Sequence, residues 1–311
     1  MNLTVHVGTT KTGTSSIQQF LNRNCGTLRA NGYLVPSSLG SVIHLNAVMS
    51  SLPYGESPDL AKFLGVKDAG EHAAFRESTV AAFRNEVAAA NDCREVLISA
   101  EYLHSRLPRR EHVQTFRDLF CRDFDRVRIV VYVRPQIDQI VSLYSSVLRT
   151  GYARPLKDFI DSRMKPFFWP YFDLRDVITR WTDTFGTENV TVRPYKAITG
   201  PLGTVGDYCE FLGINPDASE WTFGRQANTS INRAGQELLL MLNQSGNLDG
   251  EMRRKVCKWT ETHCPGRGAK PSPEQARTFQ SLFDDSNAWV TETYFPDHPD
   301  YLQPSVSVGT D

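Results

Sequence analysis

The sequence has few of the features that mark membrane and nucleic-acid-binding proteins. Its 34 basic and 35 acidic residues leave a formal net charge of −1, so no basic excess is available for nucleic acid or for a membrane surface. No apolar run reaches the roughly 18 residues that a membrane-spanning helix requires, and no internal repeat or low-complexity tract is visible. We therefore expect neither a nucleic-acid partner nor a transmembrane segment.

Cysteine is also scarce. The six cysteines in 311 residues include no Cys-x2-Cys pair, and such scattered residues usually serve as small buried groups or free thiols. Cys257, His263 and Cys264 are close in sequence, but a fourth ligand with the spacing of a zinc site is missing. We expect no metal site.

The amino-terminal residues lack the basic region and apolar core of a secretory signal and predict a strand instead. This pattern favours a cytoplasmic protein. With 40% hydrophobic and 22% charged residues, a chain of this length can bury a sizeable core.

Residues 3–16, LTVHVGTTKTGTSS, predict a strand, a loop and a helix in succession. Unpaired backbone N–H groups and the positive end of the helix dipole meet at such a junction, which suits it to hold an anion. The alternative is a turn in which Thr12 or Thr14 only caps the helix, but such a turn would need neither the lysine nor so many hydroxyls. The segment therefore predicts a site for a phosphate-like group.

This loop differs from the nucleoside-triphosphate loop. Gly8 and Gly13 have the required separation, but Thr14 stands where that loop has its lysine. Lys11 lies inside the loop instead, two residues before Gly13, from where it would project over the bound group. No strand ends in a convincing magnesium-binding aspartate. The pattern disfavours an ordinary ATPase or kinase and favours a transfer that requires no metal.

A second segment predicts another phosphate contact far along the chain. Residues 127–133 form an apolar, β-branched run that is typical of a strand buried on both faces. Arg134 follows this strand directly, and Ser142 lies two turns into the helix predicted for residues 136–148. A guanidinium supplies forked donors to a phosphate, and a serine hydroxyl adds a neutral donor.

Together the two segments resemble the sulfotransferases that use 3′-phosphoadenosine 5′-phosphosulfate (PAPS). Residues 10–16 are similar to the 5′-phosphosulfate loop of that family, usually Pro-Lys-[Ser/Thr]-Gly-[Ser/Thr]-[Ser/Thr], although Thr10 replaces the common proline. The resemblance implies that the 5′-phosphosulfate is bound by Thr10, Lys11, Thr12, Gly13, Thr14, Ser15 and Ser16. It implies that Arg134 and Ser142 bind the 3′-phosphate.

The segment at 225–232, which precedes a predicted helix, offers one further candidate contact with the nucleotide. In many members of the family such a loop folds over the nucleotide, and Arg225 would then close the cofactor site here. Helix capping explains the neighbouring polar residues equally well, namely Asn228, Thr229 and Ser230. Both interpretations remain open.

The order of predicted elements indicates an α/β fold. Strands are expected at 95–99, 127–133 and 189–195, and a short strand or extended turn at 31–36. Helices are expected at 13–24, 71–90, 112–120 and 136–148. Such alternation predicts a mostly parallel central sheet flanked by helices, as in P-loop NTPases, with ligands at the carboxyl ends of the strands. No helix is predicted in the polar region 36–70, whereas residues 201–300 are expected to be mainly helical. We expect one sulfotransferase-like domain over 1–311, with its PAPS-binding core at about 1–200.

Sulfuryl transfer needs positive charge on the leaving oxygen and a base near the acceptor. Lys11 is the candidate for the charge. Glu101 is the preferred base because it directly follows the strand at 95–99, and His104 is the rival. His44 is a candidate for the acceptor cleft, whereas His6, inside the first strand, is expected to pack against its neighbours.

We therefore expect a PAPS-dependent sulfotransferase that modifies a hydroxyl or amine of a carbohydrate or small metabolite. Two alternatives remain, a non-catalytic relative that binds a nucleotide or anion and an atypical small-molecule kinase. The acceptor itself is not predicted. Its binding is expected to involve regions 36–70, 150–170 and 245–275, which contain the aromatic residues Phe167, Phe168, Trp169 and Trp259.

Overall fold

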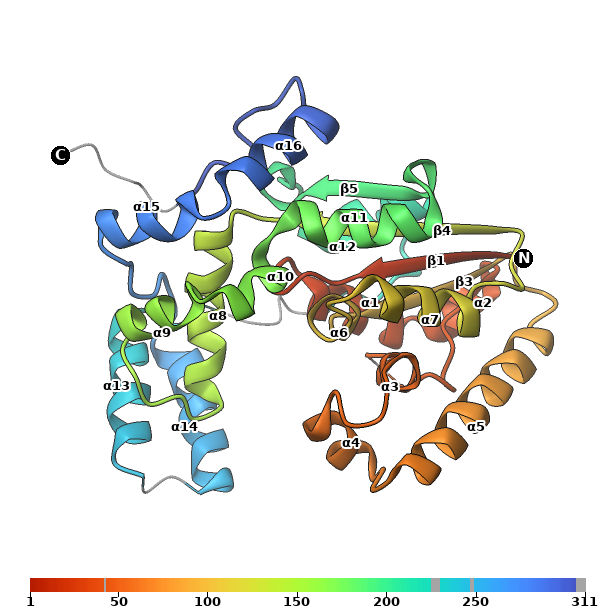
Figure 1. The fold of residues 1–311 in the computed structure, drawn as a ribbon, viewed down its shortest axis with the longest axis horizontal. Coiled ribbons are helices and arrows are strands. Elements are labelled where there is room, and N and C mark those ends of the chain that lie inside the picture. Colours follow the sequence, from red (N-terminus) through yellow and green to blue (C-terminus); the bar gives the residue numbers. More distant parts are fainter. Residues whose placement is uncertain (42, 225–229, 247–248, 306–311) are drawn as a thin grey trace. The chain divides into compact units, whose positions relative to one another are not determined.

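The computed structural model describes residues 1–311 except 42, 225–229, 247–248 and 306–311 (Figure 1). The chain divides into two compact units. The first comprises residues 1–133 and 175–224, and the second comprises residues 134–174 and 225–311.

The first unit is built on a five-stranded sheet in which every described pairing is parallel. Its strands are β1 (Asn2–Val7), β2 (Tyr33–Leu34), β3 (Glu95–Ala100), β4 (Arg126–Val133) and β5 (Val190–Pro194), in the order β2-β3-β1-β4-β5. Strands β3 and β2 lie on one side of β1, and β4 and β5, which follow later in the chain, lie on its other side. The carboxyl end of β1 is therefore a topological switch point, where open parallel sheets bind their ligands.

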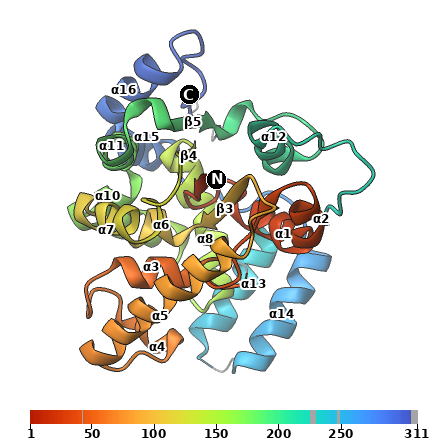
Figure 2. The ribbon, with the colours of Figure 1, turned by 90° about the vertical axis from the view of Figure 1, so that its right-hand side faces the viewer.

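Helices cover both faces of this sheet (Figure 2). One face carries α1 (Thr14–Arg23), α2 (Cys25–Ala30) and α12 (Gly203–Leu212), and the other carries α6 (Tyr102–Ser105), α7 (Arg110–Phe120) and α11 (Leu174–Phe185). The helix α3 (Leu45–Ser51) packs against α7 and against α5 (Ala69–Ala88). The predicted α/β fold with a parallel, helix-flanked sheet is confirmed.

The region 36–70 differs from the prediction because it contains two helices, α3 and α4 (Pro58–Leu64). Both have only seven residues, too few to display a clear apolar period in the sequence. Helix α3 forms through tertiary contacts, since six of its seven residues are buried.

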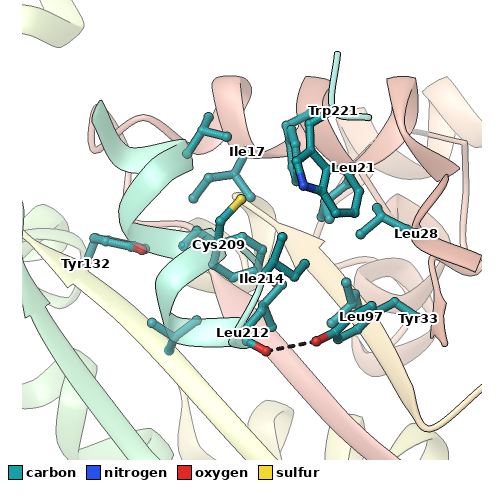
Figure 3. Close-up of a cluster of buried hydrophobic side chains, with 14 residues drawn as sticks. Ile17, Leu21, Leu28, Tyr33, Leu97, Tyr132, Cys209, Leu212, Ile214 and Trp221 are labelled. Carbon is teal, nitrogen blue, oxygen red and sulfur yellow. Dashed lines mark hydrogen bonds between the residues drawn. The ribbon is translucent and has the colours of Figure 1, made fainter. Parts of the chain in front are cut away.

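The core on the α1 side explains how the helices are held on the sheet (Figure 3). Ile17 of α1, Leu97 of β3 and Cys209 of α12 are fully buried within it. Tyr33 of β2 donates a hydrogen bond of 2.9 Å from its hydroxyl to the carbonyl of Leu212. Each large apolar side chain buried in this way contributes about 1.5–3 kcal/mol, so this core fixes the position of α1 and of the loop before it.

The second unit is helical in the described residues. It contains α8 (Gln136–Arg149), α9 (Leu156–Arg163), α10 (Trp169–Phe172), α13 (Arg233–Gln244), α14 (Gly250–His263), α15 (Pro273–Ser281) and α16 (Asp284–Tyr294). Gln280 accepts a 3.1 Å hydrogen bond from the backbone N–H of Ile137 and donates one of 2.8 Å to Gln136. A side chain of α15 therefore satisfies a donor in the first turn of α8. The prediction of a mainly helical 201–300 is confirmed.

Candidate functional site

The predicted anion loop begins at the carboxyl end of β1, between the ends of β3 and β4. Val7 is aligned with Ala100 and with Val131 in the two neighbouring strands. The N–H of Gly8 donates a 3.2 Å hydrogen bond to the carbonyl of Ala100. A Cβ at Gly8 would lie 2.3 Å from Cγ2 of Thr14, so the start of the loop has no room for a side chain.

The loop is held in shape by its own threonine hydroxyls. Thr9 donates to the carbonyl of Tyr132 in β4. Thr12 and Thr14 donate to the carbonyl of Thr9, at 2.6 Å and 3.3 Å. Neither of them caps α1, because the N-cap residue is Gly13 and no side chain caps that end. The hydroxyls of Thr12 and Thr14 therefore serve hydrogen bonds within the loop.

Four consecutive amides of the loop are available as donors. Within the described ranges, no hydrogen bond is recorded from the backbone N–H groups of Thr12, Gly13, Thr14 and Ser15. Lys11 and Gly13 both have left-handed backbone, with φ of 67° and 85°. Turns that include left-handed residues form concave nests of N–H groups that bind anions, and here the nest coincides with the start of a ten-residue helix.

A second helix reaches the loop from far along the chain. A Cβ at Gly13 would lie only 2.4 Å from Oγ1 of Thr204, in the first turn of α12. The Thr204 side chain therefore packs directly on the backbone of Gly13. Thr204 was not among the residues expected from the sequence, where nothing links two positions so far apart.

Glu101 lies beside this loop, as its place after β3 predicted. It occupies the N-cap position of α6, and its Oε1 accepts a 3.2 Å hydrogen bond from the hydroxyl of Thr10. Burial raises the pKa of the Glu101 carboxyl, while the Thr10 hydrogen bond and the positive charge of Lys11 act in the opposite direction. A half-buried carboxylate with a raised pKa suits a general base.

The three histidines considered for the sheet and the transfer site, His6, His44 and His104, are all buried. Nδ1 of His44 accepts a 2.9 Å hydrogen bond from the N–H of Ser99, and burial lowers the pKa of His44 to about 4. Nδ1 of His6 lies 2.8 Å from Oγ of Ser99, and its ring contacts Tyr132 edge-on. His6 thus packs in the sheet, as expected.

The candidate 3′-phosphate residues belong to the second unit. Arg134 directly follows the last residue of β4, Ser142 lies on α8, and both are half-buried. Their role stays a prediction. Arg225 lies outside the described residues.

The aromatic residues expected near an acceptor also belong to the second unit. Phe167, Trp169 and Trp259 are 85%, 40% and 48% exposed. Phe168 lies under the guanidinium of Arg163, 4.2 Å from the ring centre. Exposed aromatic faces of this kind can stack on a sugar or a ring.

The parts of the chain that the structure describes hold no group of three His, Cys, Asp or Glu residues arranged to bind a metal ion. In the same parts of the chain, no helix has both the length and the apolar character needed to cross a bilayer.

No model of a known protein family matches the chain. A sulfotransferase from Alicyclobacillus acidocaldarius has a similar structure, with a TM-score of 0.44 and 17% identity over 81% of this chain and 98% of that one. This structure and the two described next are all sulfotransferases or sulfotransferase domains. The sulfotransferase domain of the Synechococcus PCC 7002 olefin synthase has a TM-score of 0.41 and 10% identity, covering 91% and 94% of the two chains.

A third similar structure is the sulfotransferase domain from the curacin biosynthetic pathway, with a TM-score of 0.38 and 12% identity over 90% of this chain and 96% of that one. Among curated sequences, an uncharacterized protein of Archaeoglobus fulgidus is 28% identical over 134 residues. The match covers 42% of this chain and 34% of that protein, so the chain spans about a third of the length of this relative.

Proposed function

We propose that the chain is a sulfotransferase that transfers a sulfuryl group from PAPS to a hydroxyl or amine of a carbohydrate or small metabolite. One observation carries the proposal: a nest of open amides with Lys11 at its rim lies beside a half-buried carboxylate that contacts the same loop. The nest suits a phosphosulfate, and the carboxylate suits the proton of an acceptor.

Each group of this site then has a chemical task. The amides of Thr12 to Ser15 bind the equatorial oxygens, while Lys11 stabilises the negative charge that develops on the leaving bridging oxygen. Glu101 takes the proton of the acceptor, whose oxygen or nitrogen bonds to sulfur as the bond from sulfur to the bridging oxygen breaks. No metal ion is needed for these steps.

Two observations favour Glu101 over His104 as the base. Glu101 is hydrogen-bonded to the anion loop, and its side chain is half-buried. His104 is 2% exposed, which leaves little access for an acceptor. We expect Glu101→Gln to abolish most transfer with little effect on nucleotide affinity, and an unchanged rate would assign the base to His104.

Titration calorimetry with 3′-phosphoadenosine 5′-phosphate (PAP), followed by a labelled-PAPS screen against glycans, phenols and amines, tests the proposal. Tight PAP binding and transfer to one acceptor class support it. Absence of PAP binding would refute it. Binding without any transfer would indicate a non-catalytic relative, and magnesium-dependent ATP turnover would indicate a kinase.

The 3′-phosphate contact can be tested separately with a ligand that lacks this group. Arg134→Gln should weaken PAP binding by about 10- to 100-fold, the range for a lost charge-assisted hydrogen bond. Binding of adenosine 5′-phosphate should change little, because it has no 3′-phosphate. Equal losses for both ligands would contradict this role of Arg134.

A further inference from the structure

Thr10 occupies the loop position at which the sequence departs from the sulfotransferase pattern. The common residue there is proline, which has no hydroxyl. In this chain the hydroxyl of Thr10 donates to Oε1 of Glu101 at 3.2 Å. Thr10 is only 2% exposed and Glu101 is half-buried, so this contact is partly buried.

The backbone holds Thr10 and Glu101 close together in the absence of a ligand. The hydrogen bonding of β1 with β3 continues one residue past the end of β1, from the N–H of Gly8 to the carbonyl of Ala100. Thr10 and Glu101 follow these residues closely in the chain. Two short segments therefore bring the pair together without a rearrangement.

We infer that Thr10 is a positioning residue that holds one oxygen of Glu101 and leaves the other oxygen for the proton of the acceptor. The terminal torsion of a glutamate is broad, with no sharp rotamer. A hydrogen bond to one oxygen restricts that torsion and fixes the direction of the second oxygen. This inference rests on the proposed function, because Glu101 is the base only in a transfer reaction.

The same hydrogen bond opposes the effect of burial on the pKa of Glu101. Burial raises the pKa of Glu101, and the Thr10 hydrogen bond and the Lys11 charge lower it. A bound phosphosulfate would offset the charge of Lys11. It would not offset the hydroxyl, which is neutral, so the contribution of Thr10 persists in the loaded site.

The test compares Thr10→Val, which removes the hydroxyl at nearly constant shape, with Thr10→Ser, which keeps it. We expect Thr10→Val to lower kcat by about tenfold, the effect of losing one charge-assisted hydrogen bond. We also expect it to shift the acidic limb of the kcat profile to higher pH. PAP affinity should fall by less than kcat does, because the hydroxyl of Thr10 contacts Glu101, and Thr10→Ser should resemble the wild type. An unchanged kcat and pH profile in Thr10→Val would overturn the inference.

The chain offers a matched control for a general loss of stability. Thr4 of β1 donates the same kind of hydrogen bond to Oε1 of Glu95 in β3. Thr4→Val should leave kcat unchanged. In a Glu101→Gln background, Thr10→Val should cause no further loss of kcat, and a full tenfold additional loss would show that Thr10 acts independently of Glu101.

One measurement separates this inference from the proposed function. Carboxyl carbon NMR follows the titration of Glu101 without any acceptor, and the signal absent from Glu101→Gln identifies it. A higher Glu101 pKa in Thr10→Val supports the contact even if no transfer is found. An unchanged Glu101 pKa in an active enzyme would refute the inference alone.

Discussion

Replacement of Lys11 separates the effect of its backbone conformation on stability from the effect of its charge on the rate of transfer. Lys11 has a φ of 67°, in the left-handed region that costs a residue with a Cβ about 1–2 kcal/mol. Lys11→Ala and Lys11→Gly both remove the ammonium, but only glycine removes the backbone cost. Glycine in turn loses about 0.5–1 kcal/mol more conformational entropy on folding than alanine does.

The glycine variant should therefore be more stable than the alanine variant by about 0.8 kcal/mol, or roughly 1 °C in Tm for a chain of 311 residues. Both variants should lose about 10²- to 10³-fold in kcat, the loss expected when one stabilising group for the leaving oxygen is removed. If both results are obtained, the left-handed backbone at Lys11 destabilises the free protein, and the ammonium that it positions is needed for transfer.

Urea unfolding without nucleotide, together with single-turnover transfer, measures the two effects. If Lys11→Ala is at least as stable as Lys11→Gly, the left-handed backbone at this position is not a source of strain. If either variant keeps wild-type turnover, the ammonium does not act on the leaving oxygen.

Further predictions concern stability. Gly13→Ala should destabilise the protein by about 2–5 kcal/mol in urea unfolding, since it adds a left-handed residue and an overlap with Thr204. Gly26 lies in α2 with open space around it, so Gly26→Ala should instead stabilise the protein by up to about 1 kcal/mol. Equal changes in unfolding free energy for Gly13→Ala and Gly26→Ala would contradict this explanation. Burial lowers the pKa of His44 to about 4 and that of His6 to about 3, below the value near 6.5 of an unfolded chain. The unfolded state therefore binds protons first, so the urea midpoint should fall as pH decreases from 6.5 to 4; a flat midpoint would refute this.

The sequence predicted β3 and β4 well because they are short apolar runs, whereas the segment expected at 31–36 forms only the two-residue β2. The run at 127–133 became β4, and the run at 95–99 became β3, each within one residue. A strand buried on both faces is a nearly continuous apolar run, and such a run is visible in the sequence itself. Helices α3 and α4 were missed because such short helices depend on what they pack against.

The candidate site was predicted only in part. The order of strands and loops was enough to expect Glu101 near the anion loop, since parallel strands end at the same edge of a sheet. The hydrogen bond from Thr10 could not be predicted, because it depends on the backbone path between Gly8 and Lys11. The packing of Thr204 on Gly13 also depends on how α12 folds back over the sheet.

The sequence by itself determined the chemistry available to this protein: a loop rich in glycine and hydroxyls, one lysine within it, and a carboxylate after a buried strand. These are local facts, because composition and spacing along the chain set them. The tertiary structure decided which of these groups are hydrogen-bonded within the fold and which are open to a ligand. It turned the hydroxyls of Thr12 and Thr14 inward, left the backbone amides open, and joined Thr10 to Glu101, since hydrogen-bond partners are chosen only when distant segments meet.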